Sequence, residues 1–327
     1  MKILLPLILG GAILYWMYRD FDFSLLNQTL QQDMNWWWML LSLPFGVTAQ
    51  VFRGLRWRQP LTPLGEHARV STSISAIFLS YATSLVIPRV GEFLRCGILK
   101  RYDDVTFTKS LGTVVTERAV DTLVVIVITL TTILLQMPMF LRFFSTTGLR
   151  INDIFSQFTT TGYIVTFICI VAMLILIWTL VSRMDIYKKV KETASNLWQG
   201  IISLRMVKNK PLYIAYTLGI WGSYFLHFYL TFYCFEATAH LGIGCALVAF
   251  VVGSIAVIVP TPNGAGPWHF SVKTMLILYG VETNAALLFV LIVHGVQTSL
   301  MVLLGIVGWC MLARSRRIHP EKVESNN

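Results

Sequence analysis

The chain of 327 residues is too apolar for a soluble enzyme, because hydrophobic residues make up 55% of it and charged residues only 13%. Soluble domains carry roughly 25% charged residues. The formal net charge of +10 comes from 26 basic and 16 acidic residues, and basic residues of membrane proteins collect on the cytoplasmic side. Composition therefore predicts a polytopic membrane protein and argues against a disordered or fibrous chain. No nucleic-acid partner is expected.

The first half of the chain contains two apolar runs and then a broken one. Residues 3–16 predict a first span that is retained rather than cleaved, and residues 36–52 predict a second. A basic loop is expected next, holding Arg53, Arg56, Arg58 and Arg69. Residues 74–87 are apolar but too short to cross a core of ~30 Å. They stop at Pro88, and a polar helical half follows, so we expect a re-entrant broken helix pair.

The second half repeats this pattern. The remaining full spans are predicted at 110–136, 160–181, 212–235 and 285–312. The basic segment 183–210 has apolar residues at helical spacing, which predicts an amphipathic helix on the membrane surface, with a solvated loop as the alternative. Residues 246–259 form another short apolar run that stops at Pro260, and a helical half follows at 268–279. A basic tail at 314–327 closes the chain.

These elements predict an all-α integral membrane protein with six full spans and two re-entrant broken-helix pairs. Charge placement puts both termini in the cytoplasm. Three full spans separate the two pairs, so the second pair enters from the opposite face. The chain then forms one transmembrane domain, 1–327, with an inverted-topology repeat of roughly 36–136 and 212–313, an architecture that recurs in transporters. The alternative is two unrelated spans kinked by proline.

The first break carries charged residues that suit an anion. Pro88 pre-sets a helix start, and the free N–H groups of the following turn favour a negative group. Arg89 and Arg95 add positive charge, and Glu92 lies three residues from each. One interpretation is a binding site for an anionic lipid head group. The other is an ion pair, between Glu92 and either arginine, that closes the helix break.

The second break is rich in glycine and proline. Asn263, Gly264 and Gly266 allow the backbone to approach a ligand closely. His269 and Lys273 follow on one face of the next helical half. This segment is expected to receive the same head group from the outer side. A tight turn in a kinked helix is the alternative interpretation.

A third group of charges lies near the start of the span at 110–136. Glu117, Arg118 and Asp121 are costly at membrane depth without partners, and we expect them to support the site through a network with Arg89 or Arg95, with direct contact to the head group as the alternative. His227 and His294 are each alone in a span and are expected to be satisfied interior residues. The sequence shows no catalytic motif, and no metal or cofactor is expected.

Four segments together resemble a known family. They are FRGLRWR at 52–58, PRVGEFLR at 88–95, ERAVD at 117–121 and PTPNGAG at 260–266. In this order they resemble the flippase-like transmembrane domain of bacterial lysyl-phosphatidylglycerol synthases, over nearly the whole chain. The resemblance implies transfer of lipid between leaflets of the bacterial inner membrane, without the soluble aminoacyltransferase domain. The family commonly has an acidic residue after the glycines, where this chain has Pro267, Trp268 and His269, which would favour a different head group.

The leading functional prediction is therefore translocation of an anionic or zwitterionic phospholipid, or of a polyprenyl-phosphate lipid. Enzymatic activity is not expected. Two alternatives remain open: a non-catalytic scaffold that recruits a separate lipid-modifying enzyme through 183–210, and a membrane-embedded transferase acting on lipid head groups. Membrane lipids are the expected partners, and homo-oligomer formation is left open.

Overall fold

The structure, a computed structural model, describes residues 4–19, 21, 34–137, 203–259 and 261–315. These residues are helical apart from turns, short loops and one isolated antiparallel bridge between Met34 and Phe235. The all-α prediction is confirmed for this part of the chain. The predicted span at 160–181, most of 183–210 and nearly all of the tail at 314–327 lie outside the described residues.

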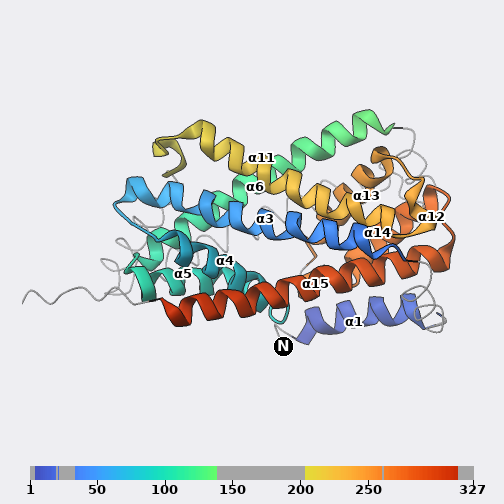
Figure 1. The fold of residues 1–327 in the computed structure, drawn as a ribbon, viewed down its shortest axis with the longest axis horizontal. Helices are drawn as coiled ribbons and strands as arrows, with labels where there is room; N and C mark the ends of the chain where they lie inside the picture. The colour runs from blue at the N-terminus through green and yellow to red at the C-terminus, as the bar shows by residue number, and fades with distance from the viewer. Residues whose placement is uncertain (1–3, 20, 22–33, 138–202, 260, 316–327) are drawn as a thin grey trace, which may run out of the picture.

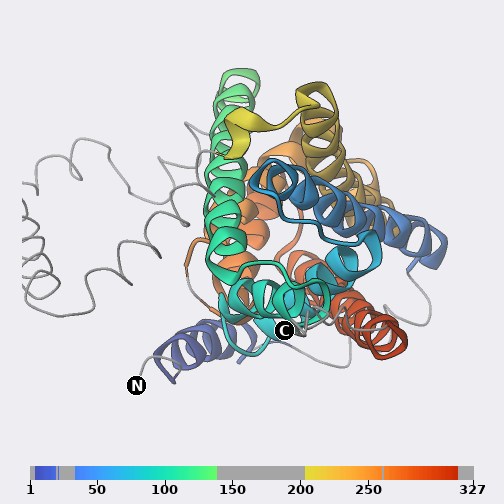
Figure 2. The same cartoon turned by 90° about the vertical axis from the view of Figure 1, so that its left-hand side faces the viewer.

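Four long helices form the frame of the molecule (Figure 1). They are α3 (Trp36–Leu61), α6 (Phe107–Leu135), α11 (Lys210–Leu230) and α15 (Thr283–Arg314). By length and composition, α6 and α15 qualify as membrane spans among the described helices. Helix α3 packs along α11, and α6 runs obliquely to α3 and α15 in Figure 1 and stands upright in Figure 2. Helices α3 and α6 carry most of the charged residues of the site described below.

Side-chain caps fix where three of these helices begin. The Asn35 side chain accepts a hydrogen bond from the backbone N–H of Trp37, and α3 starts there. Asn209 caps α11 in the same way. The Glu282 carboxylate caps α15 through the N–H of Ala285. Each cap satisfies an N–H group that the first helical turn leaves without a partner.

Helix α3 is longer than the sequence predicts. The predicted span ended at residue 52, but the helix continues through nine more residues to Leu61, so Arg53, Arg56 and Arg58 are helical. The prediction of a basic loop is therefore wrong for these three residues. The helix tolerates their charges because each guanidinium finds acceptors on other segments. Nε of Arg58, for example, donates to the carbonyl of Ala68 at 2.7 Å.

Both predicted helix breaks are present. The first pair is α4 (Val70–Ser84) and α5 (Val90–Asp103), and the second is α13 (Ile243–Ala256) and α14 (Pro267–Leu278). In each pair the two short helices pack against each other. The pairs lie towards opposite ends of the long axis in Figure 1. Pro260 lies outside the described residues.

The first pair is held together by a close approach of its backbones. A Cβ atom at Gly91 of α5 would overlap the carbonyl group of Ser80 on α4. Only glycine allows α5 to lie this close to α4. At the end of the pair away from the break, Nε of Arg69 lies 2.6 Å from Oδ1 of Asp103. This ion pair joins the start of α4 to the end of α5.

The loop before α4 is tied to the start of α6. The Glu66 carboxylate accepts hydrogen bonds from the backbone and hydroxyl of Thr106, and pairs with Lys109 at 2.9 Å. Although burial opposes the charged form, these bonds hold the pKa of Glu66 below its usual range. The charged carboxylate thus stabilises this end of the first pair at neutral pH.

The remaining described elements are short. They are α1 (Leu4–Tyr18), η2 (Thr62–Leu64), η3 (Ser203–Met206), η4 (Thr231–Cys234), α12 (Glu236–Ala239) and η5 (Pro262–Gly264). Helix α1 corresponds to the predicted first span, but its 15 residues are fewer than the about 20 that cross a membrane. It packs on α14, and the Tyr18 hydroxyl donates to the carbonyl of Leu287.

Candidate functional site

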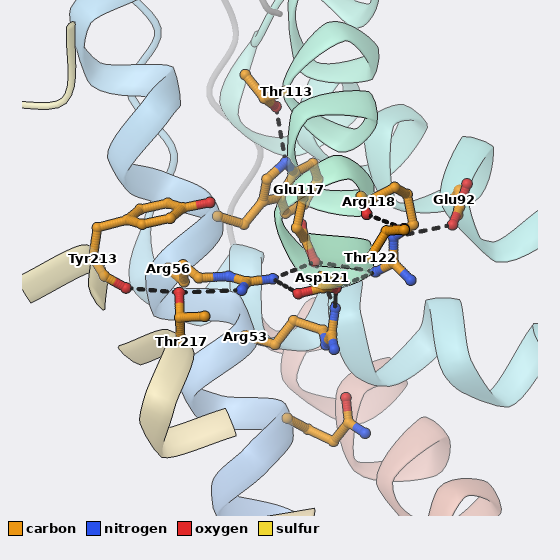
Figure 3. A network of polar contacts seen from close by, with 12 residues as sticks. Arg53, Arg56, Glu92, Thr113, Glu117, Arg118, Asp121, Thr122, Tyr213 and Thr217 are labelled. Carbon is orange, nitrogen blue, oxygen red and sulfur yellow. Dashed lines mark hydrogen bonds and ion pairs between the residues drawn. The ribbon is translucent and has the colours of Figure 1, made fainter. Parts of the chain in front are cut away.

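Buried arginines and carboxylates from three helices meet in one cluster (Figure 3). Nη1 of Arg53 lies 2.7 Å from both Glu117 and Asp121, and Nη2 of Arg56 lies 2.7 Å from Asp121. Nη1 of Arg95, on α5, lies 2.9 Å from Glu117. Two arginines one turn apart on α3 thus face two carboxylates one turn apart on α6. We call these residues, together with Arg118 and Glu92, the arginine–carboxylate cluster.

Aromatic rings enclose the arginines. The Arg95 guanidinium lies 4.6 Å from the centre of the Trp57 ring, and Arg53 lies 5.6 Å from Tyr81 and 5.8 Å from Tyr224. A guanidinium over an aromatic face is stabilised by the ring quadrupole. The rings also hold these arginines in fixed positions, away from water.

Arg118 lies at the edge of the cluster. Its side chain is 42% exposed, and its Nη2 atom lies 3.2 Å from Glu117 and 3.5 Å from Asp121. Its Nε atom lies 3.5 Å from the Glu92 carboxylate on α5. Arg118 therefore connects the buried charges to the surface between α5 and α6.

The cluster carries one more positive than negative charge, since four guanidinium groups face three carboxylates among the described residues. Nε and Nη2 of Arg95 are buried and have no hydrogen-bond partner within the described residues. Buried charged donors without acceptors are costly, and guanidinium groups bind carboxylate or phosphate oxygens well. Nε of Arg53 and Nε of Arg56 lack a partner in the same way, so the described cluster has more guanidinium donors than carboxylate acceptors.

The structure brings together most of the predicted residues of the first break. Arg95, Glu117, Arg118 and Asp121 form one network, as the sequence suggested for Arg95. Glu92 pairs with Arg118 rather than with Arg89 or Arg95. Arg89 stays outside: its side chain is exposed, its φ is 66°, and it makes no ion pair within the described residues.

The first turn of α5 offers fewer free donors than predicted. The N–H of Val90 donates to the carbonyl of Ile87, and the N–H of Glu92 donates to the carbonyl of Arg89. These groups are therefore already satisfied by the preceding turn. The positive charges of the cluster, rather than the helix start, provide the attraction for an anion.

Sequence reasoning missed Arg53 and Arg56 as site residues. A span predicted from apolar composition ends where charges begin, so both were assigned to a loop. One signal was available: the arginines are three residues apart, and Glu117 and Asp121 are four apart, so each pair lies on one helical face. Matching charged faces on two spans indicate helices that pair.

The second break forms a separate cluster. Nδ2 of Asn263 donates to the Thr298 hydroxyl at 2.7 Å, and the carbonyl of Asn263 lies 3.1 Å from Nε2 of His294. The ring centres of His269 and His294 are 4.4 Å apart. His294 is thus not the lone histidine that the sequence indicated. Lys273 lies one turn beyond His269, with Nζ 5.9 Å from the Trp16 ring centre of α1.

Glycine is required at the turn that leads into α14. Gly266 has φ 91°, and a Cβ atom there would lie 3.0 Å from the carbonyl oxygen of Gly10 on α1. Gly264 also has a positive φ, 71°. The predicted close backbone approach is therefore present, but its partner in the structure is α1. The side chain and carbonyl of Asn263 in this turn bond to α15, which contributes no residue to the arginine–carboxylate cluster.

Comparison with known proteins identifies the family. The family described as lysylphosphatidylglycerol synthase TM region matches residues 3–305. The chain belongs to this family. It is therefore a transmembrane domain of a kind associated with lipid modification, and the resemblance carried by the four sequence segments is confirmed. No significant match to a curated protein or to a solved structure was found.

Proposed function

We propose that this membrane domain moves a lipid with a phosphate-containing head group between leaflets, and that the arginine–carboxylate cluster binds that head group. The lipid would be an anionic or zwitterionic phospholipid or a polyprenyl phosphate. The observation that carries this proposal is the unmatched positive charge of the cluster, together with the two buried donors of Arg95 that lack acceptors. Ionisable groups at membrane depth usually mark a substrate path.

The partly exposed Arg118 would meet the head group first. A phosphate oxygen would then compete with Glu117 for Arg95, since both are anionic acceptors of the same guanidinium. Exchange of one acceptor for another keeps the buried arginines paired in both states. Such an exchange lets the head group arrive and leave without a large energetic barrier.

Replacing Arg95 removes its two guanidinium donors that lack acceptors, and this change should remove the bound lipid. Arg95→Gln is expected to lower the amount of co-purifying lipid, measured by mass spectrometry, about tenfold or more, because a charged hydrogen bond contributes about 1.5–3 kcal/mol. Arg118→Gln should lower it as well while leaving the pair of Arg95 with Glu117 intact. The matched control is Arg101→Gln, an exposed arginine on the same helix. If all four proteins carry the same bulk lipid mixture, the cluster binds no head group.

The proposed architecture has six spans, both termini in the cytoplasm, and pairs that enter from opposite faces. In a variant with Cys169 and the exposed Cys310 both replaced by Ser, we expect Asn284→Cys to react with a membrane-impermeant maleimide in intact cells. Arg101→Cys should react only after permeabilisation. The two positions lie beside the second and first pairs, respectively. Labelling of both from the same side would contradict the inverted topology.

The family description supports one alternative, a non-catalytic subunit for a separate lipid-modifying enzyme. Under that alternative, the purified chain would not move fluorescent phosphatidylglycerol across a liposome bilayer. It would instead retain a synthase in a pull-down, independently of Arg118. Transport by the purified chain that is lost in Arg118→Gln would favour translocation.

A further inference from the structure

We propose that His269 and His294 form a proton-binding site, which takes up one proton when an anion lies at the second helix break. The two imidazoles face each other across α14 and α15, beside the turn formed by η5. The site is distinct from the arginine–carboxylate cluster. Its part in transport rests on the proposed function, but proton binding itself does not.

The partners of His294 suit both of its protonation states. The carbonyl of Asn263 can only accept and lies 3.1 Å from Nε2, nearer than the Asn263 amide nitrogen at 3.4 Å, so these contacts favour a hydrogen on Nε2. On the other side, Nδ1 lies 3.4 Å from the Thr298 hydroxyl. A hydroxyl donates to neutral Nδ1 and accepts from protonated Nδ1. His294 can therefore gain a proton without losing a hydrogen bond.

The geometry allows the pair to hold only one proton. The Nδ1 atom of His269 is buried and has no partner within the described residues, and His269 is only 3% exposed. Its ring centre is 4.4 Å from that of His294, too close for two positive charges in an apolar setting. Trp268 packs against both rings, at 5.5 and 5.2 Å, and keeps the pair away from water.

Among the described residues, no carboxylate is paired with either histidine. Helix α1 presents the Tyr18 ring to His269, and α14 carries Lys273 one turn away. Helix α13 has no charged residue, and the only charged residue of α15 is Arg314 at its far end. A proton here adds to the charge of Lys273, so an anion at the turn would favour its uptake. By reciprocity, the proton would favour the anion equally.

Protonation of this site would also affect the backbone conformation of the second helix break. Asn263 has a left-handed backbone, with φ 52°, and its side chain and carbonyl both bond to α15 residues of this site. A change of charge at His294 thus acts on the turn between α13 and α14. Proton binding and movement of the second pair would then be coupled.

The test is a histidine titration by nitrogen NMR, in which the six histidines are labelled and the protein is held in lipid nanodiscs. Between pH 8 and 5 we expect the buried pair to contribute one imidazolium signal beside those of the exposed histidines, and this signal should appear at a higher pH in phosphatidylglycerol discs than in phosphatidylcholine discs. His294→Asn should abolish it, whereas His240→Asn, at an exposed position, should not. Thr298→Val should move the transition down by about 1–2 pH units, through loss of one charged hydrogen bond.

Two outcomes would overturn the proposal: neutral signals for His269 and His294 down to pH 5 in both lipids, or an unchanged transition in Thr298→Val. Thr298→Val keeps the size of the side chain, so it remains informative if His294→Asn does not fold. A normal titration combined with no lipid movement across liposomes would overturn the proposed function alone.

Discussion

Replacing Glu117 by Gln is expected to destabilise the protein by about 3–5 kcal/mol, the cost typical of breaking a buried ion pair from one side. The Glu117 carboxylate lies within 3.3 Å of Arg53, Arg56, Arg95 and Arg118, and its side chain is 3% exposed. The neutral amide would leave four guanidinium groups with Asp121 and the distant Glu92. The repulsion among them would no longer be offset.

The measurement is thermal unfolding in mild detergent, followed by tryptophan fluorescence. The matched control is Glu92→Gln, because the Glu92 side chain is 30% exposed and its ion pair with Arg118 is 3.5 Å long. A surface pair of this kind contributes about 0–1 kcal/mol. The same chemical change should therefore have a large effect at one position and a small one at the other.

A double variant separates charge balance from packing. Removing Arg95 and Glu117 together, as Arg95→Gln with Glu117→Gln, deletes one charge of each sign. The double variant should be more stable than the sum of the two single changes predicts, because the two residues are in contact. Additive effects, or equal stability of Glu117→Gln and Glu92→Gln, would show that the cluster does not depend on charge balance.

The sequence is informative about the helix breaks because their causes are local. A proline ends an apolar run that is too short to span, and glycines follow, so both pairs could be placed from nearby residues alone. The short helices α4 and α13 begin three or four residues earlier than predicted and end three residues earlier. The last residues of each predicted run form the turn instead.

The arginine–carboxylate cluster could be predicted only in part, because its contacts join residues far apart in the chain. Arg53 and Glu117 are 64 residues apart, and no local pattern shows that their helices touch. The same holds for His269 and His294, because they lie on separate helices, α14 and α15. Arg89 shows the opposite case: its position after Pro88 suggested a site, but a left-handed backbone leaves it outside the cluster.

Replacing Gly91 by Ala is expected to cost about 1–3 kcal/mol or more, the range for overpacking a filled site. A Cβ atom there would overlap the carbonyl of Ser80 and approach the Ser84 hydroxyl to 2.6 Å. The backbone carbonyl of Ser80 cannot relieve the overlap by changing its rotamer, as a flexible side chain could. The first pair must therefore open, which also moves Arg95 on α5 away from Glu117.

Gly97 provides the control for Gly91, because it lies on the same helix and a Cβ atom there would meet nothing within 4 Å. Gly97→Ala should be neutral or stabilise α5 by up to about 1 kcal/mol, since alanine favours helices more than glycine does. Thermal unfolding of both variants, beside the lipid content of each, tests the link between the close approach and the cluster. If Gly91→Ala unfolds like Gly97→Ala and retains its lipid, the contact between α4 and α5 does not position Arg95. If Gly91→Ala loses lipid at a temperature where it is still folded, the close approach of the two helices is what aligns Arg95 with the head group.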